Sequence, residues 1–334
     1  MDVTIVIVSW NTCGILRDCL RSTFEQTGGL ACEVIVVDNA SADDSVQMVK
    51  REFPDVRVIE NAENRGFAGA NNQGMVIAQG RYVLLLNSNT IVLEGALAKT
   101  LAFADAHREA AVVGCRVLNA DRTLQASCFM FPSVLNMVLA AAYLYKFFPK
   151  SRFFGRERMT WWDKNDARAV DVISGCFMLV RQEAMKQVGL MDDSFFMYAE
   201  ETDWCYRFKQ AGWKNLYTPD GSIIHLGGQS TALVSAPMTA QLRLSILKFV
   251  GKHRSLPAYW MSCIAIALFF LVRIPVWLMI WVLRPGKRDA SRAKLYAYTT
   301  ALGRVLLALT QVPRSTSPAV VEGPAEQGAT EGNR

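Results

Sequence analysis

The sequence predicts an α/β protein in which a mostly parallel sheet is covered by helices on both faces. Over the first 120 residues, short runs of Val, Ile and Leu alternate with segments of helical spacing. These runs are apolar at nearly every position, which is typical of parallel strands buried on both faces. A third observation, the apolar run 258–283, adds membrane-associated helices near the C-terminal end.

The alternation assigns the elements of the first half in turn. Strands are expected at 3–9, 33–38, 56–60 and 81–86. Helices are expected at 15–26, near 43–53 with Asp43 or Asp44 as its cap, and near 68–79. Open parallel sheets bind ligands at the carboxyl ends of their strands, so the polar residues there are candidates for a site. They are Ser9-Trp10-Asn11, Asp38-Asn39, Glu60-Asn61 and Asn87-Ser88-Asn89.

The remaining chain divides by composition. We expect an α/β half at 1–120, and a mixed α+β half at 121–250 with strands at 169–181 and 222–230. A membrane-associated helical segment follows at 256–312. The tail 313–334 is rich in Pro, Gly, Ser, Glu and Ala, so it is expected to be disordered.

Charge and cysteine usage narrow the partners and the compartment. Basic and aromatic residues interleave at 146–158, and a second basic group at 284–294 follows the most apolar run. Beside such a run, a membrane surface is a better partner than nucleic acid. The eight cysteines form no CxxC pair, which favours reduced, buried thiols. The first residues lack a basic region and a cleavage site, so the bulk of the chain is expected to be cytoplasmic.

The apolar run 258–283 is long enough to cross a bilayer, which needs about 20 residues. Arg273 and Pro275 interrupt it, and basic residues flank both ends. Three interpretations therefore stay open: a crossing helix, a kinked or re-entrant helix in the cytoplasmic leaflet, and a buried core helix. An amphipathic pattern follows at 294–309.

Three strand-end motifs suggest nucleotide chemistry. Asp38 in VVDNAS offers a carboxylate for a nucleobase N–H or a ribose hydroxyl, although an Asx turn explains it equally well. ENRGFAGANNQG (63–74) describes a polar loop entering a helix, where Arg65 or backbone amides meet a phosphate. It is neither a P-loop nor a GxGxxG, which weakens the case for an NAD-dependent oxidoreductase. Asn89 in LLLNSNT offers a metal only a neutral carbonyl.

The stretch FFMYAEETDWCYR (195–207) places three acids among aromatic residues. Acids in apolar surroundings are costly unless they are paired or used. By themselves they are explained by the first turn of a helix that runs to Gly212, where acidic side chains are common.

In this order, six segments resemble the nucleotide-sugar transferases of glycosyltransferase family 2, and most closely the rhamnosyltransferase-like branch of bacterial surface polysaccharide synthesis. They span residues 3 to 230 and are VSWN, VVDNAS, NRGFAGANNQG, LLLNSNT, the segment 173–207 and HLGGQS. The resemblance implies a glycosyltransferase A-type fold, with a Rossmann-like, mostly parallel sheet and a mixed C-terminal part. It also implies an inverting reaction and a diphosphate leaving group held by Mg²⁺ or Mn²⁺.

The resemblance also assigns roles to residues. Glu201 takes the place of the acid that deprotonates the acceptor hydroxyl, which is mostly Asp in the family. Beyond the resemblance, we place Glu200, Asp203 and Trp204 on the acceptor side: Glu200 and Asp203 are expected to order the helix start, and Trp204 could stack on a sugar ring. Asn89 replaces the usual metal-binding Asp, so metal dependence rests on its carbonyl and on His225. The implied nucleotide-sugar contacts are Ser9, Trp10, Asn11, Asp38, Asn39, Asn64, Arg65, Gly66, Phe67, Asn71, Asn87 and Ser88.

We therefore expect a membrane-associated inverting glycosyltransferase at the cytoplasmic face of the inner membrane. It would transfer a sugar, with rhamnose from dTDP-rhamnose as the first candidate, to a lipid-linked saccharide in cell-surface polysaccharide synthesis. One alternative is a transferase that glycosylates polyprenyl phosphate directly. Another is a catalytically decayed scaffold of a polysaccharide assembly complex, which the replacements at Asn89 and Glu201 would explain.

Overall fold

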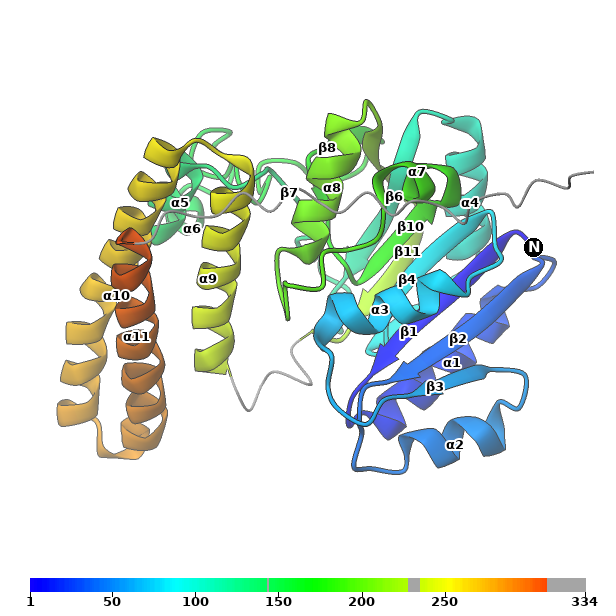
Figure 1. The fold of residues 1–334 in the computed structure, drawn as a ribbon, viewed down its shortest axis with the longest axis horizontal. Coiled ribbons are helices and arrows are strands. Elements are labelled where there is room, and N and C mark those ends of the chain that lie inside the picture. Colours follow the sequence, from blue (N-terminus) through cyan, green and yellow to red (C-terminus); the bar gives the residue numbers. More distant parts are fainter. Residues whose placement is uncertain (143, 228–234, 311–334) are drawn as a thin grey trace, which may run out of the picture.

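The computed structural model describes residues 1–142, 144–227 and 235–310, and a nine-stranded mixed sheet lies at its centre (Figure 1). The strand order is β3-β2-β1-β4-β10-β6-β11-β5, with β8 paired to β11. The strands of this sheet are β1 (Val3–Ser9), β2 (Cys32–Asp38), β3 (Arg57–Glu60), β4 (Tyr82–Asn87), β5 (Thr90–Val92), β6 (Ala110–Leu118), β8 (Arg168–Val170), β10 (Phe177–Arg181) and β11 (Lys214–His225). A separate two-stranded sheet pairs β7 (Cys128–Phe129) with β9 (Val172–Ile173).

The predicted parallel sheet is confirmed in strands β1 to β4, which pair in parallel. Strand β10 is antiparallel to both β4 and β6, so the second half of the sheet is mixed. This is the predicted α/β architecture with a mixed C-terminal part.

Helices cover both faces of the sheet, as the apolar strands predict. One apolar core joins the sheet to α1, α2 and α4, and the other joins it to α3, α7, α8 and the C-terminal helices. The helices of the α/β body are α1 (Cys13–Gln26), α2 (Ser45–Glu52), α3 (Gly66–Val76), α4 (Ala96–Ala106), α7 (Gln182–Val188) and α8 (Glu200–Gln210).

Two predicted strands in the second half have different bounds in the structure. The segment 169–181 is not one strand, because Asp171 separates β8 from β9 and Ser174-Gly175-Cys176 separate β9 from β10. The strand predicted at 222–230 begins earlier, at Lys214, and ends at His225. Residues 228–230 of HLGGQS lie outside the described residues.

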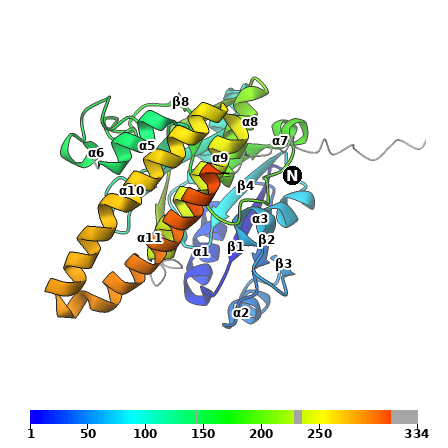
Figure 2. The same ribbon diagram turned by 60° about the vertical axis from the view of Figure 1, so that its left-hand side comes forward.

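The C-terminal helices pack beside the α/β body (Figures 1 and 2). They are α9 (Ser235–His253), α10 (Leu256–Leu283) and α11 (Arg288–Leu309), with the short turn η2 (Pro285–Lys287) between the last two. Next to α10 lie α5 (Val134–Ala141) and α6 (Leu144–Phe147). Within the described residues, α10 alone has the length and apolar composition to cross a membrane, which is weak evidence because core helices pass the same test. The predicted disordered tail, 313–334, lies outside the described residues.

Candidate active site

The carboxyl ends of the strands gather the predicted polar residues at one edge of the sheet. Ser9 is in register with Asp38 across β1 and β2, and Val8 is in register with Asn87 across β1 and β4. At the same edge, His225 at the end of β11 is in register with Thr90. Four chain segments, the ends of β1, β2 and β11 and the connection from β4 to β5, therefore meet where a ligand of such sheets binds.

Asp38 is buried, and its two carboxylate oxygens differ. Oδ2 accepts a hydrogen bond from the Ser41 amide at 2.9 Å, which makes the Asx turn that the sequence allowed. Oδ1 is buried and has no hydrogen-bond partner among the described residues. Leaving a buried carboxylate oxygen unsatisfied is expensive, so Oδ1 is suited to accept from a ligand N–H or hydroxyl.

Three of the predicted nucleotide-sugar contacts are instead occupied within the loop that enters α3. The Asn39 side chain donates to Asn64 Oδ1 at 2.9 Å and accepts from the Arg65 amide at 2.9 Å. Asn71 is buried and donates to the Phe67 carbonyl at 2.9 Å. The side chains of Asn39, Asn64 and Asn71 therefore stabilise the conformation of this loop.

Trp10, Asn11 and Arg65 are exposed at the ends of β1 and of the loop before α3. Asn11 Oδ1 accepts from the Ala42 amide at 2.7 Å, which ties the loop after β1 to the loop after β2. Ser9 Oγ and Ser88 Oγ lie 3.0 Å and 3.4 Å from Thr12 Oγ1, so both buried hydroxyls belong to one small network under the edge. Among the predicted nucleotide-sugar contacts, Trp10 and Arg65 have exposed side chains that make no hydrogen bond to the described residues.

Gly66 brings the loop that enters α3, which we call the donor-side loop, into contact with the stretch 195–207. Its φ of +71° is in the left-handed region, and an added Cβ would lie 2.2 Å from the Phe196 carbonyl oxygen. The next amide, that of Phe67, donates to the same oxygen at 2.9 Å. A side chain at position 66 would push the two segments apart, so glycine permits this close approach.

The stretch 195–207 turns sharply before α8 begins. Tyr198 and Ala199 have φ values of 68° and 67°, which non-glycine residues rarely adopt. Two consecutive strained residues of this kind are typical of functional segments, because the surrounding contacts must hold them in place. They direct Glu200 and Glu201 into the first turn of α8.

Glu200 and Glu201 are a pair of acids with unequal access to solvent. Glu200 is 4% exposed and its Oε2 has no partner among the described residues, whereas Glu201 is partly exposed. Burial raises the pKa of Glu201 to about 7 despite the opposing backbone amides of the helix start. Burial, and then the neighbouring charge of Glu201, raise the pKa of Glu200 well above its usual range. A partly exposed carboxyl with a pKa near 7 has the properties of a general base.

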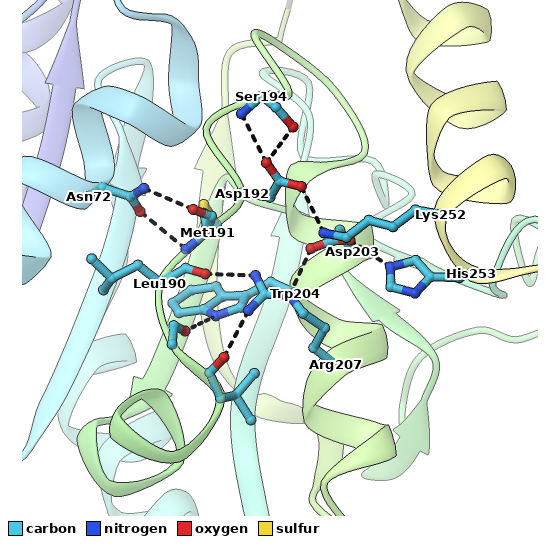
Figure 3. Close-up of polar contacts among 12 residues, drawn as sticks. Asn72, Leu190, Met191, Asp192, Ser194, Asp203, Trp204, Arg207, Lys252 and His253 are labelled. Carbon is cyan, nitrogen blue, oxygen red and sulfur yellow. Dashed lines mark hydrogen bonds and ion pairs between the residues drawn. The ribbon is translucent and has the colours of Figure 1, made fainter. Parts of the chain in front are cut away.

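Asp203 does not face an acceptor, which corrects the prediction from the sequence. Its side chain is 0% exposed, and its oxygens lie 2.8 Å from Arg207 Nε, 2.8 Å from Lys252 Nζ and 2.6 Å from His253 Nε2 (Figure 3). Burial opposes its ionisation, but the hydrogen bond from His253 and the charges of Arg207 and Lys252 outweigh burial. They hold the pKa of Asp203 well below its usual range.

Trp204 is also a core residue, and its predicted stacking on a sugar ring is wrong for this structure. The side chain is 0% exposed, and its indole N–H donates to the Gly189 carbonyl at 2.8 Å (Figure 3). Its ring packs against Phe208, with centroids 5.0 Å apart. Trp204 therefore fixes α8 against the segment after α7.

With this geometry in place, the family can be identified. The model of glycosyltransferase family 2 matches residues 4–189. The chain belongs to this family. The structure is similar to a mannosyltransferase from Pyrobaculum calidifontis in complex with GDP-Man and Mn²⁺. The TM-score is 0.55 at 16% identity, with 92% of this chain and 86% of that chain covered. The predicted glycosyltransferase A-type fold is confirmed.

Curated relatives of this glycosyltransferase include an N-acetylglucosaminyl-diphospho-decaprenol L-rhamnosyltransferase of Mycobacterium tuberculosis. It is 26% identical over 275 residues, with 78% of this chain and 87% of the relative covered. A low-salt glycan biosynthesis hexosyltransferase of Haloferax volcanii is 24% identical over 213 residues, with 63% of this chain and 62% of the relative covered. The predicted enzyme class, a glycosyltransferase, is confirmed.

The residues of this glycosyltransferase at the expected metal position do not fit an ion held by protein side chains. His225 Nδ1 lies 2.7 Å from Gln125 Oε1 and Nε2 lies 3.3 Å from Asn87 Nδ2, so Nδ1–H donates and the Nε2 lone pair is in use. Burial lowers the pKa of His225 to about 4, which keeps the ring neutral. Asn89 is neutral too. Among the described residues, no three His, Cys, Asp or Glu side chains form a group that could hold a metal.

Three residues of this site carried no signal in the sequence. Gln125 orients the His225 ring from a loop a hundred residues away. Lys252 and His253 reach Asp203 from the last turn of α9, and Lys252 also contacts Asp192 at 2.7 Å. Neither periodicity nor a motif connects these positions, because only the tertiary fold brings them together.

Proposed function

We propose that this glycosyltransferase moves a sugar, with inversion, from a nucleoside-diphosphate donor to a lipid-linked saccharide at the cytoplasmic face of a membrane. The observation that carries the proposal is the position of Glu201. It is a partly exposed acid with a pKa near 7, at the start of a helix whose leading segment contacts the donor-side loop through Phe196 and Gly66. An acceptor hydroxyl and a donor held at the sheet edge would meet beside it.

The reaction follows from these positions. Glu201, ionised, accepts the proton of the acceptor hydroxyl while the hydroxyl oxygen attacks the anomeric carbon. The bond from that carbon to the diphosphate oxygen breaks, and its electron pair leaves with the nucleoside diphosphate. Attack on the face opposite the leaving group inverts the anomeric configuration.

Donor binding falls to the carboxyl edge of the sheet. We assign Asp38 Oδ1 to the nucleobase or ribose, because it is the buried acceptor without a partner among the described residues. Arg65, whose side chain is exposed at the start of α3, is assigned to the diphosphate. The metal has no part in these assignments, since the donor set at Asn89 and His225 does not fit one.

Rhamnose is the first sugar to test as the donor group. The support is the L-rhamnosyltransferase of M. tuberculosis, which aligns with 78% of this chain. That relative's name also supports a saccharide on a polyprenyl diphosphate as the acceptor, and hence a role in cell-surface polysaccharide synthesis. Purified enzyme should release dTDP from dTDP-rhamnose faster than it releases nucleotide from UDP- or GDP-sugars. Equal release from all donors would remove the rhamnose proposal and leave the reaction class intact.

The variant Glu201→Gln tests the catalytic assignment. It should bind the nucleotide sugar with unchanged affinity by calorimetry, while transfer to a polyprenyl-diphosphate saccharide is lost. Glu183→Gln, at an exposed position of α7, makes the same chemical change away from the site and should transfer normally. Near-normal transfer by Glu201→Gln would refute the assignment. Transfer to polyprenyl phosphate in place of the saccharide would instead support the direct polyprenyl-phosphate reaction.

A further inference from the structure

One side of α10 is apolar and exposed along its whole length. Exposed apolar side chains recur every three or four residues, which is one face of a helix. Between 52% and 69% of each side chain is exposed in Met261, Ile264, Leu268, Val272, Met279 and Leu283. The only charged residue of the helix, Arg273, turns inward and donates to the Ala141 carbonyl at 2.7 Å and the Phe269 carbonyl at 3.0 Å. A continuous apolar stripe of this kind indicates a lipid or protein partner.

The first half of α10 cannot enter a bilayer without the catalytic body. Tyr259, Cys263, Ile266 and Phe270 are at most 7% exposed and belong to the same apolar core as the sheet and α8. Beyond Arg273 the helix has 10 residues left, 274–283. At 1.5 Å per residue they reach about 15 Å, whereas the hydrocarbon core is about 30 Å thick. A full crossing would therefore require the core to come apart.

The turn between α10 and α11 is cationic. Arg284, Lys287 and Arg288 are exposed around η2, and Arg292 is exposed one turn further along α11. Moving such residues to the middle of a bilayer is strongly unfavourable. A hollow of about 300 Å³ at this end is lined by Trp277, Ile280 and Leu283 on its apolar side and by Arg284 and Lys287. Apolar walls next to two cations match the phosphate and upper acyl chains of an anionic lipid.

We propose that α10 and α11 lie flat in the cytoplasmic leaflet of an anionic membrane as a monotopic hairpin. The apolar stripe of α10 enters the acyl boundary, and Arg284, Lys287 and Arg288 bind lipid phosphates. The inference deepens the proposed membrane association and does not depend on which sugar is transferred.

The hairpin would also fix the distance between the membrane and the catalytic base. His253 and Lys252 end α9 just before α10 begins, and both bind Asp203, which follows Glu201 by two residues on α8. A lipid-linked acceptor emerging beside α10 would therefore meet a base whose position relative to the membrane surface is set by this ion cluster.

Topology is tested with single added cysteines and a membrane-impermeant maleimide. Gly286→Cys places a thiol in η2, and Gly28→Cys places one on the catalytic body. An added Cβ meets no atom within 4 Å at either position. With the unsubstituted chain as the background, both should be labelled in inside-out vesicles and neither in intact spheroplasts. Labelling of Gly286→Cys in spheroplasts would show that α10 crosses, and labelling only after detergent would place η2 inside the bilayer. Either result overturns the proposal.

Lipid selectivity is tested by flotation with vesicles. The full chain should float with phosphatidylglycerol-containing vesicles, and the double variant Lys287→Glu with Arg288→Glu should float at least about tenfold less. Lys99→Glu with Arg108→Glu makes the same charge change on the exposed surface at α4 and should float normally. Equal flotation of both double variants, or a stable dimer that does not float, would overturn the proposal; the dimer would assign the stripe to a second copy. Donor hydrolysis should be unchanged in both double variants. Its absence from protein that floats normally would count against the proposed function instead.

Discussion

Replacing Asp203 with Asn should destabilise the protein by about 3 kcal/mol. The carboxylate is 0% exposed and pairs with two cationic side chains, Arg207 and Lys252, which are 8% and 10% exposed, and with the ring of His253. Breaking a buried ion pair from one side costs about 3–5 kcal/mol, because the remaining charge stays buried without its partner. The lower end of this range applies here, because both cations retain partners. Arg207 still donates to the carbonyls of Val188 and Leu190, and Lys252 still pairs with Asp192.

The assay is thermal unfolding of the full-length protein in mild detergent. At about 2 °C per kcal/mol for a chain of this size, Tm should fall by roughly 6 °C. Asp192→Asn is the matched control. Asp192 is 22% exposed and its loss leaves Lys252 bound to Asp203, so its effect should stay below about 1 kcal/mol. Equal Tm changes in the two variants would refute the claim that Asp203 is the centre of the cluster.

The pH dependence gives an independent check on the same residue. The folded-state pKa of Asp203 is held below its unfolded value, so its contribution to stability is fully present above that unfolded value, about 3.9. The contribution is lost as pH falls towards the folded pKa. The Tm difference between the parent chain and Asp203→Asn should therefore be constant from pH 8 to about pH 5 and shrink below about pH 4. A difference that already shrinks between pH 7 and pH 5 would show that ionisation of Asp203 is not its source.

Four further predictions concern the site. The kcat/KM of the parent enzyme should rise about tenfold per pH unit below 7 and level off above, as ionised Glu201 is the active form, and a flat profile would exclude a base of that pKa. Asp38→Asn should raise the KM for the donor about 10- to 100-fold with kcat nearly kept, because one charge-assisted hydrogen bond is lost; an equal loss in kcat would place Asp38 in the chemical step. Gly66→Ala should lower kcat/KM on the order of 100-fold in steady-state assays, because its Cβ would meet the Phe196 oxygen, and normal kinetics would show that the close approach is dispensable. The activity of EDTA-treated parent enzyme should stay unchanged when Mg²⁺ or Mn²⁺ is added back, because Asn89 and His225 do not fit an ion, and activity that returns only with the metal would refute that conclusion.

Periodicity was enough to place the sheet edge, and the acidic residues of a helix start indicated the helix that carries Glu201. The strand ends at Ser9, Asp38 and Asn87 meet as predicted, because strands that are apolar at every position have one way to be buried. Side-chain direction could not be predicted in the same way. Trp204 was expected at a sugar ring and lies in the core, since one face of α8 must pack on the sheet and position in a motif does not identify that face.

The motifs also could not distinguish residues that contact a ligand from residues that stabilise the loops around the site. Asn39 and Asn64 have the side chains expected of ligand contacts, yet both accept from backbone amides of the loop before α3, Asn39 from Arg65 and Asn64 from Gly66. A turn with a glycine at φ +71° leaves amides that need acceptors, and Asn supplies them. Asp38 is distinguished from them by a property that no sequence pattern shows, an oxygen left buried without a partner among the described residues.

The two acids that begin α8 and the acid that follows them have opposite electrostatic environments, and this separation assigns their roles. Asp203 is held by the cations Arg207 and Lys252 and by a hydrogen bond from His253, which keep its pKa well below its usual range, so its carboxylate acts in folding. None of these side chains pairs with Glu201 in the described residues, and burial raises the pKa of Glu201 to about 7. A site that needs one carboxyl able to take and release a proton would be disabled if the cations reached Glu201, because its pKa would fall and its basicity with it. In the proposed reaction, the cluster at Asp203 would hold α8 in place while its positive charge stays paired with Asp203 and leaves Glu201 basic.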